Sequence, residues 1–404
     1  MDWYYYIALA AIISQLLFLL QTYNNYRYAL KKYKKKRSGY RPKTALIIPC
    51  KDLEPSFREN IASFFDQEYE DYLLWFVVAD ESDPAYRELC KLKNQLSKNS
   101  KTQDVQVFVA GKGKSCSQKI HNLLYCYKKI GDDIEVMAFA DSDICVRSNW
   151  LSHIVYPLRQ SKNGAASGYR WFIPTRNNLA SLALSAMNAK VTQLLGNTRF
   201  NQAWGGSMAI RVDVFRQIGL NKIWPKALSD DLSLSSAVKK AGMKVVFVPA
   251  CLAASQESTT WRKLYEFVRR QFLITRIGAP RTWWFGLCSS LFSVLGIWGA
   301  AALAIYAAMI QDKNLLLFAA VPVVFFLSQL SRAIFRQKMA TKLIEYERRA
   351  MRAACLADIF AFWLWSLLLL FLIISSTFGR TICWGGIRYK LLGPTETIVI
   401  GGQS

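Results

Sequence analysis

Four long segments without a charged residue constrain this chain more than any other feature of its sequence. The first covers residues 3–22 (WYYYIALAAIISQLLFLLQT), and three more lie near the C-terminus, at 283–310, 314–331 and 359–379. A helix of about 20 apolar residues is long enough to cross the hydrocarbon core of a bilayer. The sequence therefore predicts a multi-pass integral membrane protein with transmembrane helices at both ends.

The basic residues predict an orientation in the membrane. The cluster KKYKKKR at 31–37 directly follows the first apolar segment, and the basic n-region and small-residue cleavage site of a signal peptide are missing. Because lysine and arginine collect on the cytoplasmic side, we expect residue 1 outside and the following domain in the cytoplasm. The basic segment from Arg332 to Arg352 is expected on the cytoplasmic side too.

The charge pattern leaves the side of the C-terminus open. Three crossings from a cytoplasmic domain would place the end of the chain outside, yet Arg380, Arg388 and Lys390 favour the inside. Either one of the three apolar stretches is re-entrant or interfacial, or the tail is an exception to the charge rule.

Composition narrows the classes of partner. The formal net charge is +24, and the positive residues flank apolar segments instead of forming one recognition stripe. This pattern favours the lipid bilayer over nucleic acid as the partner. The nine cysteines form no Cys-x-x-Cys pair, and His121 and His153 are the only histidines, which argues against a disulfide framework and a zinc site.

The middle of the chain, about 38–280, is predicted to be a soluble α/β domain. Helical patterns at 56–67 and 117–130 alternate with β-rich runs at 44–49, 73–79, 105–110, 135–140 and 244–249. Such alternation is typical of a largely parallel sheet with helices on its faces, and ligands bind at the carboxyl ends of its strands. The predicted organisation is an anchor at 1–30, a basic linker at 31–37, the domain at 38–280, and membrane or interfacial helices at 281–404 with a basic cytosolic loop at 332–356 and a tail.

Aspartates follow two of the predicted strands directly. Asp141 and Asp143 end the run MAFADSD, and Asp80 and Asp83 stand in VVADESDPA. Aspartate is a common turn former, so all four could simply shape turns. Alternatively, two carboxylates at i and i+2 beyond a strand could share work, one oriented toward a sugar or ribose and one binding Mg²⁺ or Mn²⁺, with a diphosphate supplying further oxygens.

Two later segments carry further candidate groups. In LSDDLSLSSAVKKAG (228–242), Ser229 is a plausible helix N-cap and Gly242 a plausible stop. Asp230 and Asp231 either complement the helix dipole, or one of them is a general base for an acceptor hydroxyl.

The second segment is FVRRQFLITR (267–276), just before a membrane stretch. Its Arg269, Arg270 and Arg276 either follow the positive-inside rule or clamp a diphosphate leaving group, and Gln271 could position the acceptor or the donor.

The order of these motifs resembles a membrane glycosyltransferase of the family-two type with a GT-A fold, which is Rossmann-like with a mostly parallel sheet. The strongest resemblance is to the ceramide glucosyltransferase family. It rests on segments spread over nearly the whole chain: PCKDLEP (49–55), ADESDPAY (79–86), SQKIHNL (117–123), GGSMAIRVDVF (205–215) and GIRYKLLGPTETI (386–398).

The resemblance implies a role for each matching residue on the donor side. Asp80, with Asp83 in the same motif, would contact the uracil or ribose of a nucleotide sugar. Asp141 and Asp143 would form the DxD element, with Asp143 the preferred ligand of Mn²⁺ or Mg²⁺. Lys119 would lie near the nucleotide.

The same resemblance implies that Gly205, Gly206 and Ser207 form a loop close to the donor sugar. Asp231 would be the catalytic base, with Asp230 as its neighbour. One departure concerns the family pattern of Arg or Gln, two residues, then Arg-Trp: counting from Arg270, Leu273 and Ile274 stand where Arg and Trp are expected. This puts the diphosphate and acceptor roles of Arg269, Arg270, Gln271 and Arg276 in question.

The expected function is inverting transfer of a hexose, in the first place glucose, from a UDP-sugar to the hydroxyl of a membrane lipid such as ceramide. A hopanoid or diacylglycerol acceptor and a processive polysaccharide synthase stay open as alternatives. The synthase would need more spans and a complete Arg-Trp element. A non-catalytic membrane scaffold is opposed by the retained Asp80, Asp141, Asp143 and Asp231.

Overall fold

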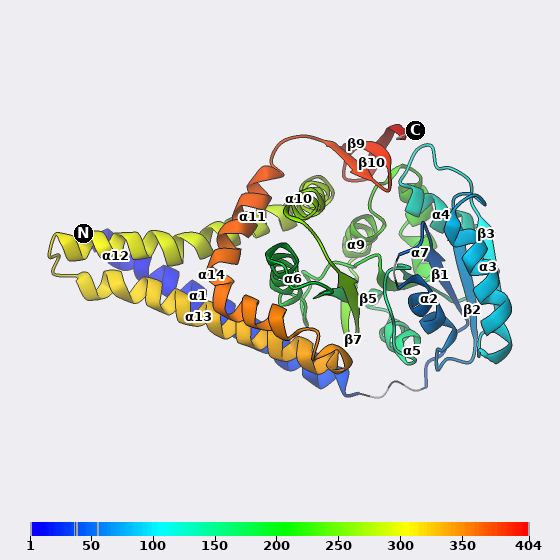
Figure 1. The fold of residues 1–404 in the computed structure, drawn as a ribbon, viewed down its shortest axis with the longest axis horizontal. Coiled ribbons are helices and arrows are strands. Elements are labelled where there is room, and N and C mark those ends of the chain that lie inside the picture. Colours follow the sequence, from blue (N-terminus) through cyan, green and yellow to red (C-terminus); the bar gives the residue numbers. More distant parts are fainter. Residues whose placement is uncertain (1, 36, 38, 55, 403–404) are drawn as a thin grey trace.

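The computed structural model describes residues 2–35, 37, 39–54 and 56–402. Lys36 of the basic cluster and Pro55 of the PCKDLEP motif lie outside the described residues. Figure 1 shows two parts: an α/β domain, and a bundle of long helices that extends away from it.

The core of the domain is a seven-stranded sheet with the order β3-β2-β1-β4-β6-β5-β7. Neighbours from β3 through β4 are parallel, β6 is antiparallel to both β4 and β5, and β7 is parallel to β5. This confirms the predicted α/β fold with a mostly parallel sheet. The strands are β1 (Thr44–Pro49), β2 (Tyr72–Val78), β3 (Asp104–Val109), β4 (Val136–Ala140), β5 (Asn163–Pro174), β6 (Ser207–Arg211) and β7 (Lys244–Glu257).

The sequence predicted five of these strands and missed two. The β-rich runs match β1 to β4 within one residue at each end, and the fifth run is the start of the longer β7. Strand β5 was missed because its first half, NGAASG, is made of small residues without the β-branched side chains that mark strands. Strand β6 has only five residues, which is too short for a periodic signal.

Helices cover both faces of the sheet because alternate strand residues point to opposite sides. Leu46 and Ile48 of β1 pack on one side, and Ala45 and Ile47 on the other. The first side is covered by α2 (Phe57–Phe65), α3 (Pro84–Leu96) and α5 (Trp150–Val155). The second is covered by α4 (Gln118–Tyr127), α7 (Val212–Gln217), α8 (Leu220–Ile223) and α9 (Asp230–Lys240). Three short 3-10 turns are η1 (Ser97–Asn99), η2 (Tyr156–Arg159) and η3 (Trp224–Lys226).

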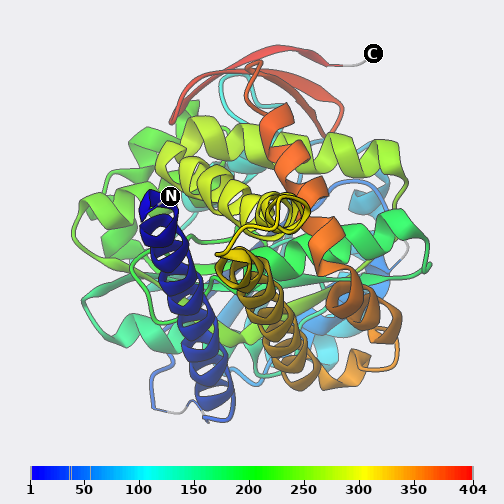
Figure 2. The same ribbon diagram turned by 90° about the vertical axis from the view of Figure 1, so that its left-hand side faces the viewer.

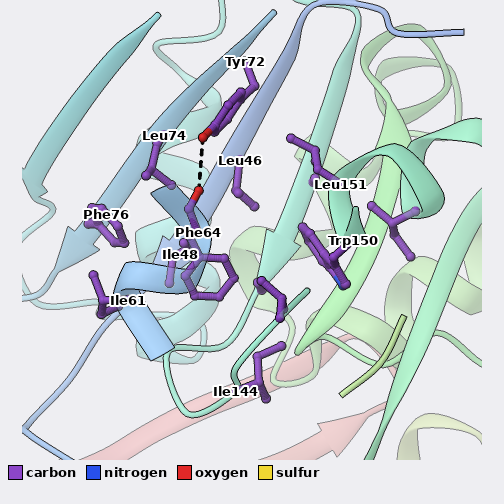
Figure 3. Packing of buried hydrophobic residues seen from close by; sticks show 14 of the residues in the cluster. Leu46, Ile48, Ile61, Phe64, Tyr72, Leu74, Phe76, Ile144, Trp150 and Leu151 are labelled. Carbon is purple, nitrogen blue, oxygen red and sulfur yellow. Dashed lines mark hydrogen bonds between the residues drawn. The ribbon is translucent and has the colours of Figure 1, made fainter. Parts of the chain in front are cut away.

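Figure 3 shows the core on the first side of the sheet, where aromatic and aliphatic side chains fill the space between α2, α5 and the strands. The hydroxyl of Tyr72 donates a hydrogen bond of 3.2 Å to the backbone oxygen of Phe64. The only polar atom of this buried ring is therefore satisfied, which removes the cost of burying it.

The helical part contains four helices that are long and apolar enough to cross a membrane, at Tyr4–Tyr33, Pro280–Met309, Leu315–Leu343 and Arg352–Ser375. They correspond to the four uncharged segments of the sequence. The helices of this part are α1 (Asp2–Tyr33), α6 (Leu179–Thr192), α10 (Trp261–Gly278), α11 (Pro280–Val294), the π-turn η4 (Leu295–Gly299), α12 (Ala300–Met309), α13 (Leu315–Leu343), the turn η5 (Glu345–Glu347) and α14 (Arg352–Ser375).

The C-terminal strands return to the α/β domain. They form an antiparallel sheet of β8 (Thr381–Trp384), β9 (Ile387–Gly393) and β10 (Glu396–Gly402). Tyr389 of this sheet is buried with Leu228 and Leu273, and its hydroxyl accepts a hydrogen bond of 3.3 Å from the backbone of Gln118. Figure 2, which looks onto the helical end, shows these strands above the helices.

The return of the chain favours one of the two explanations left open for the C-terminus. Helix α14 is kinked at Ala361, and Figure 1 shows its second half running across the direction of α12 and α13. A membrane containing α12 and α13 would therefore meet this half of α14 as an interfacial helix. Arg380, Arg388 and Lys390 then lie on the same side as the α/β domain, as their charge favours.

Candidate active site at the carboxyl edge of the sheet

Sheet topology brings two distant motifs together at one edge. Asp141 directly follows β4, and Ala140 pairs with Ser207 at the start of β6. Because β6 runs antiparallel to β4, the glycines that precede β6 lie beside the carboxyl end of β4. The backbone amide of Asp141 donates to the oxygen of Gly206 at 3.3 Å. The DSD and GGS motifs therefore lie side by side at this edge of the sheet.

Lys119 joins two carboxylates at the centre of this site. It stands in the first turn of α4, whose N-cap is Ser117. Its ammonium nitrogen lies 2.6 Å from Asp141 Oδ1 and 3.2 Å from Asp230 Oδ2. Burial by itself would lower the pKa of Lys119, but the attraction of Asp141 and Asp230 outweighs burial and raises it. Lys119 is therefore a charged bridge between β4 and α9.

Arg170 is a second cation of the site, and the sequence analysis did not identify it. Strand β5 continues past its last pair with β6, Ser167 with Met208, so Arg170 reaches the same edge. Its guanidinium nitrogens lie 3.6 Å from Asp141 Oδ2 and 3.7 Å from Asp143 Oδ2. The guanidinium also lies 4.6 Å from the ring centre of Trp204. A single arginine within an otherwise uncharged strand was the signal that could have revealed it.

The two aspartates of the DSD motif differ in how fully they are paired. Asp141 has Lys119 on one oxygen and Arg170 on the other; burial would raise its pKa, but these cations lower it. Burial raises the pKa of Asp143, against the attraction of Arg170. Asp143 Oδ1 is buried and accepts no hydrogen bond from the described residues. Asp143 therefore keeps the oxygen that is free for a cation.

The described residues supply only some of the oxygen atoms that a divalent cation needs. Carboxylate oxygens suit Mg²⁺ and Mn²⁺. Among the described residues, however, no group of three or more His, Cys, Asp or Glu gathers to hold a metal. Asp143 and Asp141 would thus hold the ion from one side, and the remaining oxygens would come from a bound diphosphate or from water.

Close packing explains why glycine precedes β6 twice. A methyl group on Gly205 would lie 2.3 Å from Asp230 Oδ2 and 2.7 Å from Lys119 Nζ. On Gly206 it would lie 2.2 Å from the Trp204 ring and 2.6 Å from Asp141 Oδ2. Only glycine leaves room for the charged groups here.

Ser207, the third residue of the motif, is fully buried at the start of β6. Its Oγ accepts a hydrogen bond of 2.9 Å from Trp150 Nε1. Its side chain is therefore directed into the core, and its role beside the donor sugar stays a prediction.

The two aspartates of α9 differ in accessibility. Ser229 caps the helix as predicted, accepting from the backbone of Leu232 at 3.2 Å. Asp230 is only 3% exposed, and burial raises its pKa to about 6. Asp231 is partly exposed; its Oδ2 accepts from the Gly205 amide at 3.1 Å, and its Oδ1 from the Ser229 hydroxyl and the Leu232 amide. Of the two, Asp231 is the carboxylate that a substrate can reach.

Asp80 and Asp83 follow β2, at the same edge but separated from β4 by β1. Asp80 accepts a hydrogen bond of 2.9 Å from the Ser82 amide, and this bond lowers its pKa. Asp83 caps α3 through the Ala85 amide and also accepts from the Asp52 amide, both at 2.9 Å. Both therefore shape the turn after β2, and their nucleotide contacts stay predictions.

The arginines of α10 contact backbone oxygens of the C-terminal segment. Arg269 donates to Ser375 at 3.0 Å, Arg270 to Cys383 at 3.3 Å, and Arg276 to Thr377 and Gly379. Gln271 is exposed on the same helix. Among the described residues, no hydrogen bond or ion pair joins these four side chains to the carboxylates, so their diphosphate role stays a prediction.

The departure from the family pattern has a packing reason. Leu273 and Ile274 are buried against Ile382, Tyr389 and Leu391 of the C-terminal sheet. An arginine and a tryptophan could not occupy these positions without separating α10 from that sheet. The segment thus anchors the C-terminal strands.

The charge balance of the site indicates what it can bind. Four carboxylates, Asp141, Asp143, Asp230 and Asp231, face two cations, Lys119 and Arg170, which leaves a formal charge of −2. The site therefore attracts cations and repels an anion that arrives alone.

Comparison with known proteins adds the following findings. The family model described as "Glycosyl transferase family 21" matches residues 4–396. The chain is similar to the mannosyltransferase PcManGT from Pyrobaculum calidifontis in complex with GDP-Man and Mn²⁺, with 14% identity and a TM-score of 0.44 over 91% of this chain and 96% of that one. It is also similar to GalNAc-T7 with UDP, GalNAc and Mn²⁺, with 14% identity and a TM-score of 0.38 over 58% of this chain and 51% of that one.

Proposed function

This chain belongs to glycosyl transferase family 21, and from that premise we propose that it transfers glucose from a UDP-sugar to the hydroxyl of a membrane lipid such as ceramide. The observation that carries the proposal is the position of Asp231, a partly exposed carboxylate beside the helices that enter the membrane. Leu232, the next residue, packs against α10 near Gly278, and the span Pro280–Met309 follows immediately.

This position suits an acceptor that stays in the bilayer. Each methylene group taken out of an apolar environment costs about 0.8 kcal/mol, so a lipid with long chains does not leave the membrane readily. A base beside a membrane helix needs only the polar head of such a lipid to emerge.

The chemistry assigned to the protein side chains is a single displacement. Asp231 accepts the proton of the lipid hydroxyl while its oxygen forms a bond to the anomeric carbon. The bond from that carbon to the diphosphate oxygen breaks, UDP leaves with the electron pair, and the configuration inverts. Hydrogen bonds from Gly205 and Ser229 fix the orientation of the Asp231 carboxylate.

The formal charge of −2 supports the requirement for a divalent cation. Asp143, with its free Oδ1, and Asp141 would hold Mn²⁺ or Mg²⁺. When bound, the ion supplies the positive charge that lets a diphosphate enter a negative site. Lys119 and Arg170 keep the neighbouring carboxylates in place around it.

The remaining donor contacts follow the family resemblance. We assign Asp80 and Asp83 to the nucleotide, Lys119, Gly205, Gly206 and Ser207 to the donor pocket, and Arg269, Arg270, Gln271 and Arg276 to the diphosphate and acceptor path. Burial lowers the pKa of Arg270, and repulsion from Arg170 of the site adds to this effect. The α/β domain is assigned to residues 38–280 and to the cytoplasmic side, as the basic residues after α1 indicate.

The test is to incubate membranes that contain the protein with radiolabelled UDP-glucose, UDP-galactose and GDP-mannose, and to identify the labelled product. A single glucose on ceramide is expected. A labelled hopanoid or diacylglycerol would show that ceramide is not the acceptor, and a labelled polymer would show a processive synthase. The absence of a labelled product with every donor would contradict glycosyl transfer altogether.

A further inference from the structure

A cavity between the membrane helices has features that the transfer reaction does not use. It lies among α1, α6, α11, α13 and α14 and has a volume of about 120 Å³. We call it the interhelical cavity; the residues that define it are Gln15, Lys190, Phe285, Arg332, Arg336 and Ser366. None of the aspartates assigned to the active site lines it.

The interhelical cavity holds more positive than negative charge. Arg336 makes a bidentate ion pair with Asp358, at 2.5 and 2.6 Å, and Gln337 donates to the same carboxylate at 2.7 Å. Asp358 is fully buried, and these donors occupy both of its oxygens. Within the described residues, no hydrogen bond or ion pair joins Asp358 to Lys190 or Arg332.

Lys190 and Arg332 accordingly have only neutral partners. The Lys190 ammonium donates to Ser366 Oγ at 2.5 Å and to the Phe362 oxygen at 3.2 Å. Burial and repulsion from Arg336 lower the pKa of Lys190 well below its usual value, against the attraction of Asp358, so a bound anion is what would favour the charged form of Lys190. Arg332 donates through Nε to Thr22 at 3.0 Å, and no described residue accepts from its two terminal nitrogens.

A third polar group of the cavity, the amide nitrogen of Gln15, has no partner among the described residues. Gln15 of α1 is only 1% exposed, and its amide nitrogen donates to none of the described residues. A buried amide without an acceptor costs free energy that a bound acceptor would recover. Lys190, Arg332 and Gln15 come from three different helices and all line one space, in which no described carboxylate pairs with either cation.

The depth of the cavity matches a lipid headgroup. Arg332 is 17 residues beyond Leu315 at the start of α13, which corresponds to about 26 Å along the helix axis. A bilayer core is about 30 Å thick, so Arg332 lies near its boundary on the side of the α/β domain. Phe285, Phe292 and Leu369 also line the cavity, and Phe285 is 44% exposed on the outside of the helices. An acyl chain could therefore pass along this wall.

We propose that the interhelical cavity binds the phosphate of an anionic phospholipid, with Lys190 and Arg332 as its charged ligands and Gln15 as a hydrogen-bond donor. The volume is several times the roughly 30 Å³ of a water molecule, which is enough for a phosphate group. A zwitterionic headgroup is a poorer fit because Lys190 and Arg332, which have no carboxylate partner among the described residues, would repel its cation.

The test uses the full chain, purified in detergent and freed of bound lipid. Its thermal unfolding is followed with phosphatidylglycerol, phosphatidylcholine, ceramide or inorganic phosphate added. Phosphatidylglycerol is expected to raise the Tm by several degrees, more than any other addition. The Lys190→Met/Arg332→Gln double variant should lose this difference, whereas Arg281→Gln, which removes an exposed charge at the start of α11, should keep it.

Three results would overturn the proposal: an undiminished phosphatidylglycerol shift in the double variant, an equal shift with inorganic phosphate, or an equal shift with ceramide. The second would indicate a site for free anions, and the third a part of the acceptor path. If the double variant does not fold, native mass spectrometry of the wild type decides, because phosphatidylglycerol must survive collisional activation that removes phosphatidylcholine. Since no readout is transfer activity, the outcome is independent of the proposed function.

Discussion

At the carboxyl edge of the sheet, Lys119 and Arg170 face four aspartates. Between the membrane helices, by contrast, Lys190, Arg332 and Arg336 lie near one described carboxylate, Asp358, which pairs with Arg336 and with neither of the other two. The first site has a formal charge of −2 and the second of +2. In both sites the excess charge lies in low-dielectric surroundings, where burying an unpaired charge costs free energy.

The opposite signs of these two charges indicate what kind of ligand each site binds. A charge left unpaired in the folded chain is stabilised when a ligand of the opposite sign arrives, so the imbalance itself selects the sign of that ligand. The sheet edge selects a cation, which in turn admits a diphosphate. The interhelical cavity selects an anion. The Arg336–Asp358 pair differs from both, because it is complete without a ligand.

The largest expected effect is that of Asp231→Asn on the rate of transfer. This variant tests the chemical role of one carboxylate apart from the charge balance of the whole site. Asp231→Asn removes the proposed proton acceptor without changing the shape of the site, so the rate of transfer should fall by roughly 10²- to 10⁴-fold. Binding of the UDP-sugar, measured by calorimetry, should be nearly unchanged. Asp213→Asn, at an exposed aspartate of α7, is the matched control and should retain full activity. Near-normal turnover of Asp231→Asn would exclude it as the base.

A second change tests whether the buried Arg336–Asp358 ion pair stabilises the fold. Asp358→Asn leaves the Arg336 guanidinium buried without a counter-charge, which should destabilise the fold by about 3 to 5 kcal/mol. Thermal unfolding in detergent measures the loss. The double variant Arg336→Met/Asp358→Leu removes both charges and should be more stable than Asp358→Asn alone. If the single variant were as stable as the wild type, the pair would not be structural.

A third change sharpens the contrast between the two aspartates of the DSD motif. Chelation of divalent cations should abolish transfer, and added Mn²⁺ should restore it. In Asp143→Asn, the Mn²⁺ concentration needed for half-maximal rate should rise by at least about tenfold, as expected when a metal contact is lost. Titration of the rate with Mn²⁺ is the measurement. An unchanged requirement would move the metal away from Asp143.

The smallest effect concerns pH and the buried Asp230. Its pKa in the folded protein is about 6, above its usual value of 3.8, so the folded state binds this proton more tightly than the unfolded state. The contribution of Asp230 to the free energy of unfolding therefore falls as the pH rises from about 4 to 6, by no more than about 1.4 kcal/mol per pH unit.

Asp230→Asn should remove this dependence. The stability of the variant relative to the wild type should thus increase between pH 4 and 6 and stay level above that, in thermal unfolding measured across this range without metal or donor. The Asp213→Asn variant should show no such trend. A constant difference between Asp230→Asn and the wild type would contradict the raised pKa.

Sequence analysis went furthest where the signal is local. The capping serine of α9, the strand before Asp141 and the spans of uncharged residues are each encoded within a few neighbouring positions, and the structure confirms them. It failed where a residue depends on a distant partner. Arg170 belongs to the site only because β5 extends beyond β6. For Asp83, the turn-forming role that the sequence left open is the one for which the structure gives contacts, to the Ala85 and Asp52 amides.

The sequence by itself determined that this protein has a mostly parallel α/β domain between membrane helices and that its aspartates follow strands, since periodicity and composition act over short distances. Only the tertiary structure decided which aspartate is buried and which is reachable, how Lys119 joins β4 to α9, and that the C-terminal strands return to the domain. It alone also brought Lys190, Arg332 and Gln15 to one cavity. These properties depend on burial and on pairing between residues far apart in the chain, and no local pattern records either.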